Sequence, residues 1–272
     1  MINKNSQLAQ TFWETGKLGV PILDFHAHMH EDNSIYLPNR EPAGMAATMD
    51  QCGTRWTLFC SHYAMRDPIA GEEYQKEAVH AFPNHFRAYH GVMAMYTDPD
   101  RHLREIEDNP DVYVGCKFLC DYYRTPLSDP AYAPYFEFLN EKNMLALLHT
   151  WGGSRHNGVD EFAKIVDKYP NVTFICGHSF FGDFSHADEL FHGKENLYYE
   201  LTAVPIVRGY IEEICEKAGS ERLLFGSDLP WFATSHSIGC VLSADLTDED
   251  RENIFWKNGD RILRRFPWYT LK

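Results

Sequence analysis

Histidine and aspartate side chains follow four separate apolar segments of the sequence. His26 and His28 are separated by one residue, and His149, His178 and Asp228 each follow a later apolar run. Residues i and i+2 of a β-strand point to the same face, so His26 and His28 can bind one ion. Imidazole and carboxylate together suit Zn²⁺, Mn²⁺, Fe²⁺ or Ni²⁺. The pattern predicts a divalent metal site, with zinc as the first expectation. In the alternative, each histidine is a hydrogen-bonded core residue.

The segments that must position these side chains alternate between two kinds. Short, nearly continuous apolar runs are typical of strands buried on both faces of a parallel sheet. They cover residues 20–25, 55–60, 87–95, 112–119, 144–148, 172–176, 197–201 and 222–225. Helical patterns separate them at residues 45–51, 72–82, 99–107, 131–142, 159–169, 207–218 and 248–266. The last begins after Thr247, a suitable N-cap residue.

About eight strand–helix units in 272 residues predict a single-domain (β/α)₈ (TIM) barrel over residues 1–272, with 1–19 as an N-terminal extension. An open, doubly wound sheet is the alternative. The barrel is favoured because catalytic groups of such barrels lie at the C-terminal ends of strands, where the polar residues occur here.

Composition excludes several classes of protein. The chain has 39 acidic and 25 basic residues, a net charge of −14, with no basic cluster that would bind nucleic acid. No apolar run approaches the roughly 20 residues of a membrane span, and no secretory signal is visible. Cys60, Cys116 and Cys176 lie inside apolar runs and are expected to be buried thiols, which fits a cytoplasmic protein. The expected partner is a small-molecule substrate, together with a homodimer contact that no sequence feature specifies.

The combined motifs resemble the amidohydrolase superfamily. The His-x-His pair after the first strand, the histidines after the fifth and sixth, and the aspartate after the eighth carry the resemblance. The details are most similar to the amidohydrolase-related branch that includes aminocarboxymuconate-semialdehyde decarboxylase. Residues 222–231 (RLLFGSDLPW) and 253–262 (NIFWKNGDRI) resemble its eighth-strand and C-terminal-helix signatures.

The resemblance implies roles for these residues. His26, His28, His149 and Asp228 would be metal ligands, and His178 would be a ligand or an acid/base beside the metal. Asp228 would also take a proton from activated water in hydrolytic members. A bound metal lowers the pKa of water, and a neighbouring carboxylate can move its protons.

Lys117 has more than one interpretation. It lies in the fourth apolar run, where an unmodified lysine is costly to bury. In relatives with two metals, a lysine at this place is carboxylated and bridges the ions. In relatives with one metal, it contacts substrate or the bound water. A salt-bridged lysine inside the barrel is the remaining alternative.

Further side chains could contact the substrate. Arg124, Arg155 and Arg208 follow predicted strands, and arginine binds carboxylates in a two-pronged manner, so an inward arginine would indicate an anionic substrate. Each could equally be an exposed loop residue. His62 and Trp151 are further candidates, for a substrate contact and an apolar pocket wall. His102 and four other helical or loop histidines are expected on the surface.

Three functions remain open. A metal-dependent hydrolase of an amide, lactone or ester is favoured, because Asp228 and the full ligand set suit activated water. A metal-dependent decarboxylase of an unsaturated or aromatic acid, with His178 as proton donor, uses the same residues. A metal-free binding barrel would not need the complete set of metal-type residues.

Overall fold

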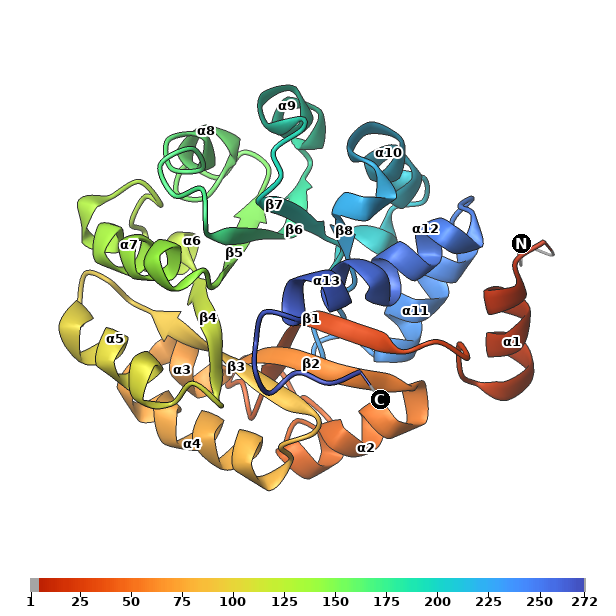
Figure 1. Cartoon of the computed structure of the whole chain (residues 1–272), viewed down its shortest axis with the longest axis horizontal. Coiled ribbons are helices and arrows are strands. Elements are labelled where there is room, and N and C mark those ends of the chain that lie inside the picture. Colours follow the sequence, from red (N-terminus) through yellow and green to blue (C-terminus); the bar gives the residue numbers. More distant parts are fainter. Residues whose placement is uncertain (1–4, 272) are drawn as a thin grey trace. The chain divides into compact units, whose positions relative to one another are not determined.

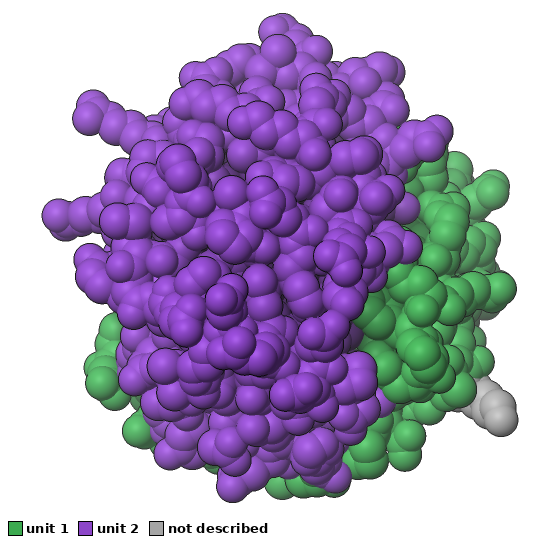
Figure 2. Space-filling model, turned by 60° about the vertical axis from the view of Figure 1, so that its left-hand side comes forward, with its two compact units in different colours: residues 1–59, 81–86, 200–272 green, residues 60–80, 87–199 purple. Residues whose placement is uncertain are grey.

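We describe residues 5–271 of a computed structural model of the chain (Figure 1). The residues group into two compact units, shown in different colours in Figure 2. Unit 1 comprises residues 1–59, 81–86 and 200–272, and unit 2 comprises residues 60–80 and 87–199. The candidate site residues are divided between the units, and each unit is described separately.

Unit 1 contains the first strands and the last third of the chain. Its elements are α1 (Gln7–Thr15), β1 (Ile22–Met29), α2 (Pro42–Cys52), most of β2 (Thr54–Ser61), η2 (Val204–Ile206), α10 (Tyr210–Ala218), η3 (Ser220–Arg222), β8 (Leu223–Leu224), α11 (Thr234–Ser243), α12 (Asp248–Glu252), η4 (Asn253–Lys257) and α13 (Asn258–Leu263). All eight residues of β1 are buried. The predicted N-terminal extension contains α1, whose first turn is held by Asp248: Gln7 N donates to Asp248 Oδ2 at 2.7 Å.

Unit 2 contains the middle of the chain. Its elements are α3 (His62–Arg66), α4 (Pro68–Ala81), β3 (Phe86–Val92), α5 (Pro99–Asp108), β4 (Tyr113–Phe118), α6 (Cys120–Tyr123), η1 (Pro130–Tyr132), α7 (Ala133–Lys142), β5 (Leu145–Trp151), α8 (Val159–Ala163), β6 (Thr173–Phe181), α9 (Phe184–Phe191) and β7 (Leu197–Glu200). The terminal residues Ala81 of α4, Phe86 of β3 and Glu200 of β7 belong to unit 1. Cys60, Cys116 and Cys176 are buried, as predicted.

The strands form one eight-stranded sheet in the order β1 to β8, with parallel pairing from β3 through β6. Within unit 1 the chain around β8 hydrogen-bonds back to β1, since Phe25 N donates to Phe225 O at 2.9 Å. Sequential parallel strands with intervening helices define a (β/α)₈ barrel, which confirms the predicted fold class. Their near-continuous apolar character follows from burial on both faces.

Two predicted helices differ in detail from those of the structure. The helix predicted over residues 159–169 ends at Ala163, because Lys164 N and Ile165 N bond to carbonyls three residues back, as in turns. The helix predicted over residues 248–266 is divided into α12, the π-helical turn η4 and α13. Thr247 caps α12 in a capping box with Asp250, so this part of the prediction is confirmed.

Candidate metal centre

In unit 1, β1 carries two histidines on one face. His26 and His28 are both buried, and their ring centroids are 5.3 Å apart. The spacing of one intervening residue produces this arrangement, because the side chains of a strand alternate between faces. The pair therefore lies as the sequence predicted.

Asp228 is placed beside this pair by backbone hydrogen bonds between β1 and the chain after β8. Asp228 N donates to His26 O at 2.8 Å, and His28 N donates to Leu229 O at 2.7 Å. Asp228 adopts a left-handed backbone with φ of 55°. Its Oδ1 lies 3.1 Å from His28 Nε2 and 3.8 Å from His26 Nε2. One carboxylate oxygen thus faces both imidazole Nε2 atoms.

Glu200, at the end of β7, is a site residue that the sequence analysis did not identify. Its Oε2 lies 2.6 Å from His26 Nδ1, and its Oε1 accepts hydrogen bonds from the backbone N and the hydroxyl of Thr202. Since Oε1 already accepts two donors, Glu200 is an acceptor toward His26, and His26 Nδ1 carries the proton. The Nε2 lone pair of His26 is then available to a metal. The sequence signal that could have identified Glu200 is its position as the one carboxylate in the apolar run 197–201.

The close approach of Glu200 depends on Gly226. A Cβ added at Gly226 would lie 1.9 Å from Glu200 Oε1 and 2.4 Å from Thr202 Oγ1. Real Cβ atoms do not approach this closely, so only glycine permits the present position of the Glu200 carboxylate.

Asp24 connects β1 to the segment that follows β8. Its Oδ1 accepts hydrogen bonds from His26 N at 3.2 Å and Ser227 N at 3.0 Å, and its Oδ2 accepts one from Ser227 Oγ. Burial raises the pKa of Asp24 to about 7, although these hydrogen bonds oppose the shift.

The unit 1 cluster fits a divalent metal ion. The candidate ligand atoms of His26, His28 and Asp228 all lie within 4.8 Å of one another. Two imidazoles and a carboxylate form a donor set that such ions accept. The carboxylate of Glu200 behind His26 orients the ring, as carboxylates commonly do for metal-binding histidines.

In unit 2, β5 and β6 bring His149 and His178 together. His149 Nδ1 and His178 Nε2 are 3.1 Å apart, within hydrogen-bonding distance. Trp151 lies nearly parallel to His149, with ring centroids 6.2 Å apart, and meets His178 edge-on at 5.4 Å. The Tyr122 ring is perpendicular to His149 at 5.6 Å. The predicted pocket residue Trp151 thus lies beside both histidines, and aromatic rings flank the pair.

The loop after β5 is attached to the carbonyl of His149. Asn157 Nδ2 donates to His149 O, and Asn157 N donates to Ser154 Oγ at 3.1 Å. Ser154 Oγ in turn donates to Asp121 Oδ1 at 2.6 Å, so the loops after β4 and β5 are tied together.

Lys117 is only 1% exposed, on β4, opposite Gly91 of β3 in the sheet register. Burial raises the pKa of Cys60 to about 12, and the positive charge of Lys117 opposes this shift. His62 is also buried and begins α3 directly after β2. Both predicted residues are therefore interior, and their roles remain predictions.

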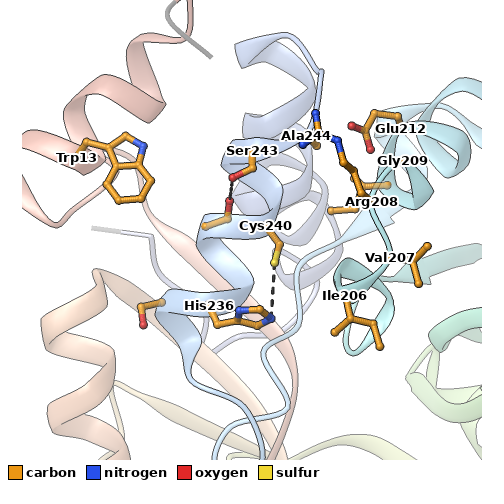
Figure 3. Close-up of a pocket in the computed structure, with 13 residues that line it drawn as sticks. Trp13, Ile206, Val207, Arg208, Gly209, Glu212, His236, Cys240, Ser243 and Ala244 are labelled. Carbon is orange, nitrogen blue, oxygen red and sulfur yellow. Dashed lines mark hydrogen bonds between the residues drawn. The ribbon is translucent and has the colours of Figure 1, made fainter. Parts of the chain in front are cut away.

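The three candidate arginines are all exposed. Arg124 ends α6 in a left-handed conformation, and Arg155 lies in the loop after β5. Arg208 lines a cavity of about 410 Å³ in unit 1, with Trp13, Ile206 and His236 among its other walls (Figure 3). The lining of this cavity includes none of the unit 1 metal-type residues.

The expectation that His102 is a surface residue is wrong. His102 is fully buried on α5 because it lies one turn before the buried Ile106, on the same helix face. Burial lowers the pKa of His102 to about 4.

Comparison with known proteins identifies the family. The family model described as amidohydrolase matches residues 23–265, so the chain belongs to the amidohydrolase family that the motifs resembled. None of the curated proteins matches the chain.

Several solved structures share the fold. The 5-carboxyvanillate decarboxylase LigW from Sphingomonas paucimobilis has 14% identity and a TM-score of 0.68, covering 90% of this chain and 99% of its own. A 2,6-dihydroxybenzoate decarboxylase complexed with 2,6-dihydroxybenzoate has 15% identity and a TM-score of 0.71, with 90% and 99% covered. A dihydroxybenzoic acid decarboxylase from Polaromonas sp. JS666, with bound manganese and 2-nitroresorcinol, has 15% identity and a TM-score of 0.69, with 93% and 100% covered.

Within residues 5–271, no helix is both long and apolar enough to cross a membrane.

Proposed function

We propose that this protein is a metal-dependent decarboxylase of an aromatic or unsaturated carboxylic acid. The observation that carries the proposal is the placement of aromatic rings at the His149–His178 pair: Trp151 lies against both histidines, and Tyr122 lies against His149. Trp151 is 37% exposed and Tyr122 is 69% exposed, so both rings have surface available to stack on a planar substrate. Membership of the amidohydrolase family and the decarboxylase names of several proteins with this fold support the same reaction.

In this proposal His26, His28 and Asp228 hold a divalent ion, and His149 serves the same reaction from β5. The ion is Zn²⁺ or Mn²⁺: the donor set suits both, and the relative from Polaromonas is described with manganese. When bound, the ion supplies positive charge that stabilises negative charge developing on the substrate.

The chemical step assigns a proton to His178. The bond between the substrate carbon and its carboxylate breaks, its electron pair stays on that carbon, and CO₂ leaves. The carbon then takes a proton, for which His178 is the donor we propose. His178 is nine-tenths buried or more, and its ring is fixed beside His149, so a donated proton has a defined direction. Exposed Arg124 and Arg155 in unit 2 are the candidate partners of an anionic substrate.

The sequence favoured hydrolysis, which uses the same metal-type residues. The two reactions differ in their products, because decarboxylation releases CO₂ and hydrolysis does not. The test is CO₂ release from 2,6-dihydroxybenzoate, 5-carboxyvanillate and related hydroxybenzoates, before and after the protein is stripped of metal and reconstituted with Zn²⁺ or Mn²⁺. A parallel panel of esters, lactones and amides is assayed by acid release.

The decisive variant is His178→Asn, because asparagine tolerates the left-handed backbone at this position. We expect kcat for CO₂ release to fall by about 10²- to 10⁴-fold, the usual contribution of a general acid. His192→Ala, at an exposed position on the surface, is the matched control and should keep full activity. Metal-dependent acid release from the second panel without CO₂ release from the first would overturn the proposal in favour of hydrolysis.

A further inference from the structure

The backbone that carries His178 has an unusual conformation. His178, Ser179 and Phe180 are three successive non-glycine residues with left-handed φ values of 66°, 50° and 49°. Side chains with a Cβ rarely adopt this region, and a run of three costs conformational free energy that the surroundings must offset. All three residues are buried.

The sheet register shows what this segment does. His149 of β5 pairs with Gly177 of β6, and Trp151 pairs with Phe181. Between these two pairs the chain advances by two residues on β5 and by four residues on β6. The extra residues of β6 form a bulge between the pairs. The bulge directs His178 toward His149, with His178 Nε2 at 3.1 Å from His149 Nδ1.

Thr150 spans this bulge from the opposite strand. Its Oγ1 donates to Gly177 O at 2.6 Å and accepts from Phe180 N at 3.1 Å. These contacts lie directly before and at the end of the left-handed run, so one hydroxyl fastens both sides of it. Thr150 is fully buried, so its side chain is shielded from bulk solvent. Gly152 N adds a backbone bond to Phe181 O at 2.8 Å beyond the bulge.

We propose that Thr150 is a positioning residue whose hydroxyl fixes the left-handed bulge of β6 and thereby sets the His178 imidazole against His149. The inference rests on the proposed function for its kinetic consequence, since His178 is the proton donor there. Thr150 follows His149 on the same strand, β5. This strand therefore carries the His149 imidazole itself and positions the His178 imidazole through the Thr150 hydroxyl. A displacement of the His178 ring by about 1 Å would slow a step that depends on orientation by roughly 100-fold.

The experiment compares Thr150→Val, which keeps the shape and removes the hydroxyl, with Thr150→Ser, which keeps the hydroxyl and removes the methyl group. Thr57→Val is the matched control, because Thr57 is fully buried and its hydroxyl has no hydrogen-bond partner among residues 5–271. Backbone amide exchange over residues 177–181 is measured by mass spectrometry, without substrate. The kcat and KM for CO₂ release are measured separately, together with metal content per chain.

We expect Thr150→Val to speed amide exchange at Phe180 by at least about tenfold and to lower kcat by roughly 10- to 100-fold, with KM changed by less than about threefold and metal content unchanged. In Thr150→Ser the exchange rate at Phe180 and kcat should both stay within about threefold of those of the original protein. Thr57→Val should change neither quantity. Unchanged exchange in Thr150→Val would overturn the inference, as would a failure of Thr150→Ser to restore it, since the methyl group would then be responsible. If Thr150→Val does not fold, Thr150→Ala is compared with Thr150→Ser by the same measurements and criteria.

The two proposals can fail separately. Amide exchange requires no turnover, so it tests the hydroxyl clamp even if the protein releases no CO₂ from any substrate. If the original protein releases CO₂ but Thr150→Val leaves amide exchange unchanged, only the role of Thr150 is overturned.

Discussion

Glu200 accepts hydrogen bonds on both of its carboxylate oxygens. Thr202 donates to Oε1, and the His26 ring donates to Oε2. A carboxamide has only one accepting end, so glutamine at this position would direct its NH₂ group toward either Thr202 N–H or His26 Nδ1–H. In either orientation the NH₂ donor of glutamine faces another donor. We expect this to change the protonation or the angle of the His26 ring.

We therefore expect Glu200→Gln to weaken metal binding by about 10- to 100-fold, the usual effect of losing such an outer partner. Competition titration of the metal-stripped protein with a chromogenic chelator and Zn²⁺ measures this affinity. Glu189→Gln, at an exposed position on α9, is the control and should bind normally. Equal affinities of the two variants would show that Glu200 does not orient His26.

At the scale of elements, the turn after β8 determines how closely the carboxylate of β7 approaches β1. β8 itself has only two residues, and the chain beyond it is paired to β1 through Phe225 and Asp228. Gly226 lies between these two contacts, where the Glu200 carboxylate fills the space of a missing side chain.

Gly226→Ala should therefore reduce the free energy of unfolding by about 1–3 kcal/mol, because overpacking forces Glu200 and Thr202 to move. Metal affinity should fall together with stability. The comparison is Gly239→Ala on α11, where an added Cβ meets nothing within 4 Å and alanine favours the helix by up to about 1 kcal/mol. Urea unfolding of both variants gives the two values, and equal stabilities would contradict the close approach described here.

At the scale of the whole molecule, buried ionisable groups outside the candidate metal cluster contribute to the response to acid. Arg101 donates to both oxygens of Glu72 at 2.5 and 2.6 Å, and His90 Nε2 lies 3.1 Å from Glu72 Oε1. Burial alone would raise the pKa of Glu72, but these partners outweigh it and lower the pKa to about 2. The neighbouring His102 ring has its centroid 4.7 Å from that of His90.

Both groups make the protein less stable as the pH falls. The folded-state pKa of His102 is about 4, below the ordinary 6.5, so the unfolded chain takes up this proton first and stability is lost between about pH 6.5 and 4. The folded-state pKa of Glu72 is about 2, below the ordinary 4.5, so its contribution is present above pH 4.5 and lost as the pH falls toward 2. We expect Glu72→Gln to cost on the order of 1–3 kcal/mol at pH 7 and to flatten the acid limb of the stability curve below pH 4.5. Urea unfolding between pH 3 and 8 measures both effects, and an unchanged acid limb in the variant would contradict them.

Much of this arrangement could be predicted locally. The alternation of apolar runs and helical patterns gave the barrel, because a strand buried on both faces must be apolar along its length. The spacing of His26 and His28 predicted that they share one face, because successive side chains of a strand point to opposite faces. Asp228 and the histidines after the fifth and sixth strands could be chosen as candidate site residues because catalytic groups of barrels occur at strand ends.

Other features depended on tertiary structure. The sequence alone determined which residues are candidate metal ligands and the order of the elements that carry them. Only the tertiary structure decided that Glu200 lies behind His26, that Gly226 makes room for it, and that Thr150 clamps the left-handed bulge at His178. The physical reason is that each of these contacts joins segments through strand register and close packing, and neither leaves a periodic signal along the chain.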